Sequence, residues 1–196
     1  MGVDGSSLLL ATRNPGKLRE FQRLLAPAGI TVLPLPDHVE LPPEDGETFD
    51  DNALPKAVAA AAATGLVAIA DDSGIEAEAL GGRPGVRSAR FAGEHATDEE
   101  NLAKLMREAP AGSGLRYVCA LAWAEPSGGR VHVVHGECRG HLAAQARGAG
   151  GFGYDPAFLP EGDFGGRAMA ELPDEEKDAI SHRGEAVREL LRWLRG

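Results

Sequence analysis

The chain has 196 residues, of which 43% are hydrophobic and only 5% aromatic, and its formal net charge at pH 7 is −10. This length fits one domain, with room for two lobes around a cleft, and the core must be built mainly from Ala, Val, Leu and Ile. The excess of carboxylates argues against a nucleic-acid polymer as partner, because such proteins usually neutralise phosphates with a basic face. A small phosphorylated ligand needs only a few local cations, so the charge leaves that class of ligand open.

No part of the sequence predicts a membrane-bound or secreted protein. No segment approaches the roughly 20 apolar residues of a membrane span. Residues 1–7 hold an Asp and no Lys or Arg, and the apolar run at 8–10 is too short for the core of a signal peptide. Cys119 and Cys138 lack metal-type spacing and are expected in the core without a disulfide. We therefore expect a cytoplasmic protein with no membrane partner.

Strand-like and helix-like apolar patterns alternate along the chain, which predicts an α/β domain. Strands are expected at residues 8–11, 30–35, 66–70, 117–123 and 130–135. Helices are expected after a turn at 12–17, at 52–64, from a cap at Thr97, and from about Arg183. The helix at 52–64 would have Asp50 or Asp51 as N-cap, Pro55 in its first turn and Gly65 at its end.

The turn at 12–17 joins a predicted strand to a predicted helix. A helix start offers backbone N–H groups and a positive dipole end to phosphate, and Lys17 adds a cation there. The turn is not a Walker A loop, because that pattern needs Gly at 11 and Ser or Thr at 18, where this chain has Ala11 and Leu18. An ordinary connection between a strand and a helix is an equally good interpretation.

Asp71 and Asp72 follow the apolar run at 66–70, at the place where open α/β sheets bind ligands. Neighbouring side chains of an extended chain point to opposite faces, so we expect one acid to face the site and the other to hold structure. Acidic residues of the loop at 36–51 precede the next helix, and Glu44 with Asp72 would suffice for a hard divalent cation that also binds phosphate. Asn52 and Lys56 share one helix face, and Lys56 is either a phosphate ligand or a surface lysine.

Near the C-terminus, two aromatic residues stand among glycines in the segment GFGYD at 151–155. Aromatic rings with nearby donors can stack on and read a purine base. Lys177, His182 and Arg183 follow as candidate donors, although a histidine at a helix start is more often structural.

Six segments in this order resemble the inosine triphosphate pyrophosphatase family, also called XTP/dITP diphosphatases. They are ATRNPGK at 11–17, ETFDDNA at 47–53, ADDSG at 70–74, LGGRPG at 80–85, GFGYDP at 151–156 and AISHRG at 179–184. The resemblance implies an enzyme that hydrolyses non-standard purine nucleoside triphosphates (ITP, dITP, XTP) to the monophosphate and pyrophosphate, cleansing the nucleotide pool. It also implies a mixed sheet with flanking helices in one domain over 1–196, elongated into two lobes around a central cleft, and a homodimer.

The resemblance further assigns roles to residues. Phosphate binding is assigned to the turn residues Thr12, Arg13, Asn14, Pro15, Gly16 and Lys17. Asp72 would activate water, Glu44 and Asp72 would hold Mg²⁺, and Lys56 and Ser73 would contact the substrate. The nucleotide pocket would be lined by Phe152, Gly153, Tyr154, Asp155, Lys177, His182 and Arg183. Since hypoxanthine and xanthine carry a 6-oxo acceptor where adenine carries an amine, Lys177, His182 and Arg183 would select the oxo group.

Two positions and two rival functions stay open. Arg13 stands where many relatives have Gly, and it puts a bulky cation in the phosphate turn. Glu47 or a neighbouring acid is an alternative to Glu44 as metal ligand. The Maf-type nucleotide pyrophosphatases are an alternative enzyme class with a similar fold. A nucleotide-binding regulatory module without turnover is the alternative outside enzymes, and Asp72, Lys17 and Lys56 argue against it.

Overall fold

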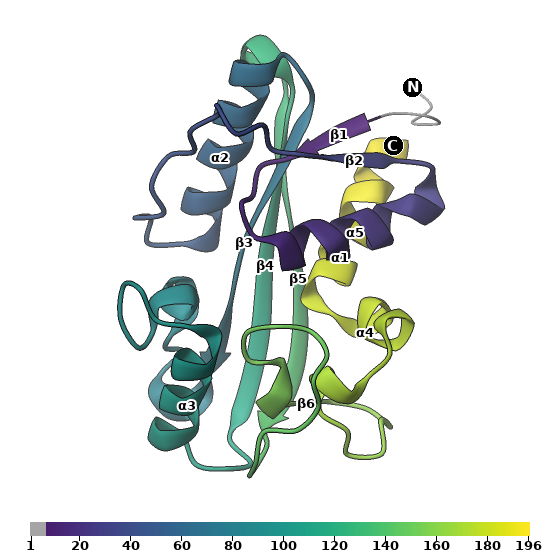
Figure 1. Cartoon of the computed structure of the whole chain (residues 1–196). Coiled ribbons are helices and arrows are strands. Elements are labelled where there is room, and N and C mark those ends of the chain that lie inside the picture. Colours follow the sequence, from purple (N-terminus) through teal and green to yellow (C-terminus); the bar gives the residue numbers. More distant parts are fainter. Residues whose placement is uncertain (1–6) are drawn as a thin grey trace. The chain divides into compact units, whose positions relative to one another are not determined.

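The structure is a computed structural model that describes residues 7–196, apart from the side chain of Ser127. Residues 1–6, most of the stretch considered above for a signal peptide, lie outside the described residues. A sheet with strand order β2-β1-β3-β4-β5-β6 forms its centre (Figure 1). β1 (Ser7–Leu10) pairs in parallel with β2 (Thr31–Pro34) and β3 (Ala68–Ala77). β5 (Val131–Leu142), the neighbour of β4 (Gly114–Ala124), pairs antiparallel with β6 (Phe158–Pro160). The sheet is therefore mixed, which confirms the predicted α/β class.

Helices flank this sheet. They are α1 (Pro15–Leu25), α2 (Phe49–Thr64), α3 (Asp98–Glu108), α4 (Asp174–Ile180) and α5 (His182–Arg195). No helix in the described part of the chain is both long and apolar enough to span a membrane.

The chain forms two compact units, each with its own hydrophobic core. Unit 1 comprises the described part of Met1–Asp72, with Cys119–Gly136 and Arg183–Gly196, and unit 2 comprises Ser73–Val118 and Glu137–His182. The core of unit 1 is built from β1, β2, the first half of β3, α1 and α5, with Phe21, Ile69 and Leu190 fully buried. The core of unit 2 is built around α3 and the 154–172 segment, with Leu105 and Phe158 fully buried.

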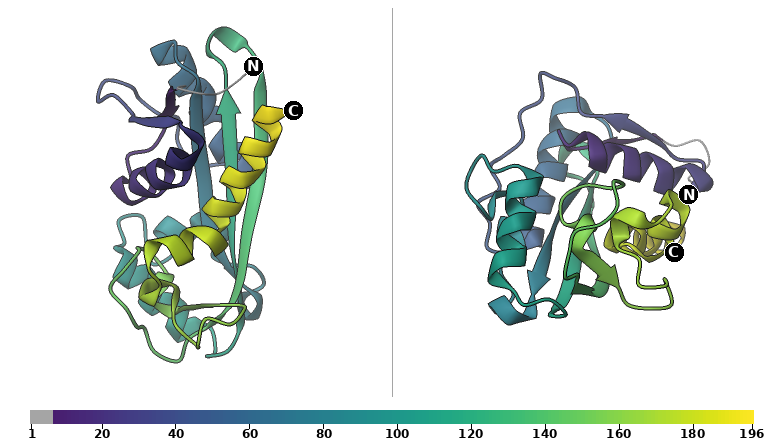
Figure 2. Two further views of the ribbon diagram at one scale, coloured as in Figure 1. Left: turned by 90° about the vertical axis from the view of Figure 1, so that its right-hand side faces the viewer. Right: turned by 60° about the horizontal axis from the view of Figure 1, so that its bottom comes forward.

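Within unit 1, α5 packs along β4 and β5 (Figure 2). The ring of Trp193 on α5 lies edge-on to Trp123 of β4 at 5.0 Å and stacks on His132 of β5 at 4.2 Å. The last helix is thus held against the sheet by aromatic contacts.

Several predicted boundaries were wrong, including that of the strand predicted at 130–135, which continues to Leu142. The helix α2 begins at Phe49 because Thr48, not Asp50 or Asp51, is its N-cap: the Thr48 hydroxyl accepts the Asp51 N–H, and Asp51 accepts the Thr48 N–H in return. Pro55 consequently lies beyond the first turn, inside the helix, whereas Gly65 ends the helix with a left-handed backbone, as predicted.

Strand β3 does not end at residue 70 but continues to Ala77. Gly74 is present in this strand because its backbone approaches a neighbouring segment closely: a Cβ there would lie 2.4 Å from the carbonyl oxygen of Gly85 and 2.4 Å from Oγ of Ser88. Asp71 and Asp72 are therefore strand residues, and the glycine that follows them marks close packing instead of a turn.

Candidate active site

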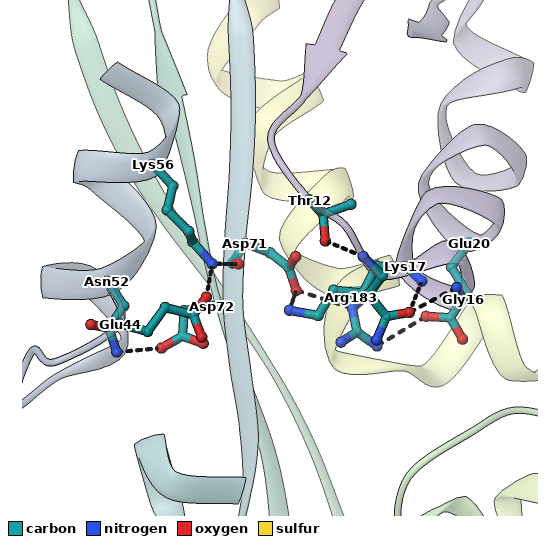
Figure 3. Close-up of polar contacts among 11 residues, drawn as sticks. Thr12, Gly16, Lys17, Glu20, Glu44, Asn52, Lys56, Asp71, Asp72 and Arg183 are labelled. Atoms are coloured by element: carbon teal, nitrogen blue, oxygen red, sulfur yellow. Dashed lines mark hydrogen bonds and ion pairs between the residues drawn. The ribbon is translucent and has the colours of Figure 1, made fainter. Parts of the chain in front are cut away.

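Asp71 and Asp72 lie inside β3 and point to opposite faces of it. Figure 3 shows Asp71 directed toward α1 and α5, and Asp72 directed toward α2. Both side chains are buried. The two acids therefore have different surroundings, as the alternation of an extended strand predicts.

Asp71 is held by two cations of unit 1. Its Oδ2 lies 3.0 Å from Nζ of Lys17 and accepts a hydrogen bond from Nε of Arg183 at 3.2 Å. Burial raises the pKa of Asp71, but the positive charges of Lys17, Arg183 and Lys56 outweigh burial and hold the pKa well below its usual range. Arg183 also donates from Nη1 to Oε2 of Glu20 at 3.0 Å. Asp71 thus stays ionised and ties α1 and α5 to β3.

Asp72 lies against the first turn of α2. Nδ2 of Asn52 donates to Oδ2 of Asp72 at 2.8 Å, and Oδ1 of Asn52 accepts the backbone N–H of Gly46, also at 2.8 Å. A Cβ on Gly46 would lie 2.7 Å from that Oδ1 and 2.5 Å from Cβ of Asp51, so the loop needs glycine to approach so closely. Burial raises the pKa of Asp72, and the hydrogen bond from Asn52 opposes it only in part. A carboxylate with a raised pKa is a stronger proton acceptor than an ordinary one.

Lys56 follows Asn52 by one helical turn and faces the same way. Its Nζ donates to the backbone carbonyl of Asp71 at 2.7 Å and to the carboxylate of Glu44. Lys56 is buried, so it is not the surface lysine of the alternative interpretation. The loop at 44–46 is therefore tied to α2 twice, at Glu44 through Lys56 and at Gly46 through Asn52.

The charges of this cluster suit a divalent cation. Its ionisable members are the cations Lys17, Lys56 and Arg183 and the carboxylates Glu20, Glu44, Asp71 and Asp72. The cluster thus holds one more carboxylate than cations. The negative charge of Glu44 contributes to the raised pKa of Asp72, and a cation near both carboxylates would relieve this repulsion.

A magnesium ion also suits the number of ligands. Groups of three or more His, Cys, Asp or Glu side chains placed to hold a metal do not occur in the described part of the chain. Mg²⁺ is usually bound through one or two carboxylates together with water and substrate phosphates. The pair Glu44 and Asp72 meets that requirement.

The predicted phosphate turn forms the start of α1. Asn14 is its N-cap, and Oδ1 of Asn14 accepts the backbone N–H groups of Gly16 at 2.8 Å and Lys17 at 3.1 Å. Oγ1 of Thr12 accepts the N–H of Asn14 at 3.1 Å, and Pro15 has no N–H to donate. The N–H groups of Gly16 and Lys17, at the start of the helix, are thus bound by Asn14. The turn also carries the Lys17 ammonium, which is paired with Asp71.

The side chain of Arg13 extends from the turn to the loop after β2. Its guanidinium donates to backbone carbonyl oxygens of the loop after β2, at distances of 2.8 to 3.2 Å: Leu35, Pro36, Asp37 and Val39. Its charge therefore stabilises that loop, because a planar guanidinium with five N–H donors can bind several carbonyls at once.

In unit 2, several predicted nucleotide-binding residues gather around Asp155. Nζ of Lys177 donates to Oδ2 of Asp155 at 2.7 Å, and the backbone N–H of Phe152 donates to the same oxygen at 3.1 Å. The Lys177 ammonium also lies 5.3 Å from the centre of the Phe152 ring. Gly151 permits this arrangement, because a Cβ there would lie 2.1 Å from Oδ2 of Asp155. Phe152, Asp155 and Lys177 therefore form one cluster.

The other residues predicted for the nucleotide site do not belong to this cluster or to one common cluster. Tyr154 is a core residue of unit 2, and its hydroxyl donates to the carbonyl of Ser88 at 2.7 Å, whereas Phe152 is partly exposed. Gly153 donates its N–H to Oδ2 of Asp98 at 2.8 Å. Ser73, partly buried, follows Asp72 in β3. His182 belongs to unit 2, whereas Arg183 belongs to unit 1.

Three residues of these clusters were not predicted as site residues. Asn52 was noted only for sharing a helix face with Lys56, and Glu20, one turn after Gly16, reads in the sequence as an ordinary exposed acid. Tyr117 donates to Oδ1 of Asp155 at 3.0 Å, yet it looks like any strand aromatic in the sequence. A buried polar contact between segments far apart in the chain leaves no local pattern.

Comparison with known proteins places the chain among enzymes of one kind. It is 47% identical to the dITP/XTP pyrophosphatase of Desulforamulus reducens, over 95% of this chain and 94% of that protein, and 48% identical to that of Mycobacterium tuberculosis, over 97% and 96%. The solved HAM1 protein of Coxiella burnetii superimposes with a TM-score of 0.83 at 39% identity, covering 96% of this chain and 98% of its own. A nucleoside-triphosphatase / dITP/XTP pyrophosphatase of Mycobacterium abscessus gives 0.70 at 44% identity, covering 94% and 98%. The Ham1 family model matches residues 8–193, and the chain belongs to the Ham1 family.

Proposed function

We propose that the protein hydrolyses non-standard purine nucleoside triphosphates, namely ITP, dITP and XTP, to the nucleoside monophosphate and pyrophosphate. The relatives that share almost half of its residues over nearly their full lengths are named dITP/XTP pyrophosphatases. The observation that carries the proposal is the cluster at β3, where a buried carboxylate with a raised pKa lies beside cations suited to phosphate. The Ham1 match favours this activity over that of the Maf-type pyrophosphatases.

In the proposed reaction Asp72 accepts a proton from a water molecule. The water oxygen forms a bond to the α-phosphorus while the bond from that phosphorus to the bridging oxygen of pyrophosphate breaks. Lys17 and Lys56 offset negative charge on the phosphates, and Asn52 orients the Asp72 carboxylate. Mg²⁺ held by Glu44 and Asp72 would supply further neutralisation of the triphosphate.

The unit 2 cluster would recognise the purine. Lys177 and His182 supply N–H donors that suit the 6-oxo group of hypoxanthine and xanthine, and Phe152 offers a ring for stacking. The family resemblance also assigns Arg183 to the pocket. Because Arg183 forms ion pairs with Glu20 and Asp71, we propose that it mainly stabilises the charged cluster around Asp71.

Several further properties rest on the family resemblance. The enzyme would be magnesium-dependent and cytoplasmic, would act as a homodimer, and would fold as one domain over 1–196. Glu44 is preferred over Glu47 as the second metal ligand. The Glu44 carboxylate accepts a hydrogen bond from Lys56, and its charge raises the pKa of Asp72.

A substrate panel tests the proposed function. Inosine, deoxyinosine, xanthosine, guanosine and adenosine triphosphates are each incubated with the protein, with and without Mg²⁺, and pyrophosphate release is measured. We expect rapid magnesium-dependent release from the first three and slow release from the last two. No turnover of any nucleotide, despite binding, would identify a regulatory module instead.

A further inference from the structure

Tyr117, in the first half of β4, is the structural link between two residues of the proposed nucleotide pocket. Its hydroxyl donates to Oδ1 of Asp155 at 3.0 Å. Its ring stacks on the imidazole of His182, with ring centres 4.6 Å apart and an angle of only 7° between the planes. All of these residues belong to unit 2, and all three are buried.

The ring of Tyr117 is held from a second direction. Phe158 of β6 lies 4.6 Å from it, with the planes tilted by 39°. A tyrosine ring between Phe158 and His182 has few alternative rotamers, because protein cores are close-packed. The hydroxyl is therefore fixed in front of Asp155, and His182 is fixed against the ring.

The hydroxyl completes the hydrogen bonding of Asp155. Oδ2 accepts from Lys177 and from the N–H of Phe152, while Oδ1 accepts from Tyr117. An ionised carboxylate has about four lone-pair sites, so three donors come close to saturating it. A further donor would find only the remaining site on Oδ1, beside the Tyr117 hydroxyl, because both sites on Oδ2 are already used.

This saturation bears on the choice of base. Adenine carries an amino group at position 6 and guanine one at position 2, and both groups are donors that seek an acceptor. Hypoxanthine has neither, and xanthine has only oxo groups at these positions. A pocket whose carboxylate already accepts three hydrogen bonds penalises amino purines, since a buried donor without a partner is costly.

We propose that Tyr117 is a specificity-determining positioning residue: its hydroxyl occupies Oδ1 of Asp155 and thereby withholds a carboxylate acceptor from the amino groups of adenine and guanine. The inference rests on the proposed nucleotide substrate. It also supplies a reason for the exclusion of guanine, which the 6-oxo group alone does not.

The substitution Tyr117→Phe isolates the hydroxyl, since the ring and its stacking on His182 are kept. We expect the ratio of kcat/KM for inosine triphosphate to that for adenosine triphosphate to fall at least about fivefold, because the freed Oδ1 becomes an acceptor for the amine. The ratio of inosine to guanosine triphosphate should fall in the same way. The change should appear mainly in KM, because Tyr117 is not among the residues that act on the phosphates.

Ser88→Ala is the matched control. It removes a buried hydroxyl of unit 2 that accepts the Ile75 N–H at 2.8 Å and donates to the Gly85 carbonyl at 2.6 Å, with no contact to Asp155. The Ser88→Ala variant should be less stable than the unmodified protein, while both kcat/KM ratios, of inosine to adenosine triphosphate and of inosine to guanosine triphosphate, stay unchanged. If Tyr117→Phe leaves the ratios within the range of Ser88→Ala, Tyr117 is merely structural and the inference is overturned.

A measurement on the unmodified protein covers the case in which Tyr117→Phe does not fold. Purine riboside triphosphate lacks any substituent at position 6, so it should be cleaved faster than adenosine triphosphate if the amine is penalised. If adenosine triphosphate is cleaved at least as fast, the inference fails. Failure of the proposed function itself gives a different result, namely no preference for inosine triphosphate in the unmodified enzyme.

Discussion

Asn52 donates a hydrogen bond from Nδ2 to Oδ2 of Asp72 at 2.8 Å, and it does so from a helix whose first turn also holds the acidic loop. The amide has a fixed donor end and a fixed acceptor end, so the N–H of Gly46 and the carboxylate of Asp72 determine its orientation together. The proposed base and the loop of the proposed metal ligand Glu44 are therefore positioned by one buried side chain.

This relationship predicts the effect of Asn52→Ala. Without the amide, Asp72 loses its orienting donor and the 44–46 loop loses one of its two ties to α2. We expect kcat for inosine triphosphate to fall on the order of 10- to 100-fold, with a smaller change in KM, because misplacement of a catalytic group acts mainly on the reaction step. Binding of Mn²⁺ as a spectroscopic probe, measured without nucleotide, should weaken as well.

Asn101→Ala provides the control for Asn52→Ala. Asn101 is an equally buried amide, on α3, that binds the loop at 89–92 through the Ala92 N–H at 2.7 Å and the Ala89 carbonyl at 3.1 Å. Both variants should lose similar stability, and only Asn52→Ala should lose turnover. Equal activity losses would show that Asn52 matters for stability alone.

The depressed pKa of Asp71 predicts how stability varies with pH. Burial raises this pKa, but Lys17, Arg183 and Lys56 lower it further than burial raises it, so the folded-state pKa lies below the ordinary 3.8. The stabilisation is then fully present above the unfolded-state pKa and is lost as pH falls toward the folded-state value.

Asp71→Asn measures this contribution. Urea unfolding of both proteins, repeated from neutral to acidic pH, should show a constant advantage of the unmodified protein above about pH 5 that shrinks below about pH 4. An advantage that grows as pH falls would show that Asp71 is not ionised in the folded protein, and a pH-independent advantage would show that folding leaves its pKa unshifted.

Arg183→Ala should destabilise the protein severely. The substitution leaves two buried carboxylates, Glu20 and Asp71, without this cation. Removing one partner of a buried ion pair typically lowers the free energy of unfolding by about 3–5 kcal/mol. Arg188→Ala, on the same helix, removes a half-exposed pair with Glu185 and should cost no more than about 1 kcal/mol. Similar unfolding free energies for the two variants would contradict the bracing role of Arg183.

The sequence predicts the elements of this fold better than their limits. Gly65 ends a helix through its left-handed backbone, and Thr97 begins one by accepting the Glu100 N–H on its hydroxyl, each where the local pattern indicates. The full length of β3 was missed because Gly74 serves a tertiary contact with residues 85–88, which no local rule reveals.

Some residues of the candidate site can likewise be predicted from the sequence, and others cannot. Residue types with one chemical use, such as Asp72 and Lys17, could be selected from their motifs and were found in one cluster of unit 1. Residues whose role depends on their three-dimensional surroundings cannot be selected from a motif. Tyr154 stands among glycines in the sequence but is buried in the core of unit 2, whereas Tyr117 has no distinctive sequence pattern and contacts both Asp155 and His182.

The most direct test of the central claim is the turnover of inosine triphosphate by Asp72→Asn, with both products quantified. The unmodified enzyme should release inosine monophosphate and pyrophosphate in equal amounts. Asn is nearly isosteric with Asp but cannot accept the proton, so the variant should stay folded and lose at least about 10²- to 10⁴-fold in kcat. Turnover by Asp72→Asn at close to the unmodified rate, or release of inosine diphosphate and orthophosphate by the unmodified enzyme, would contradict the account.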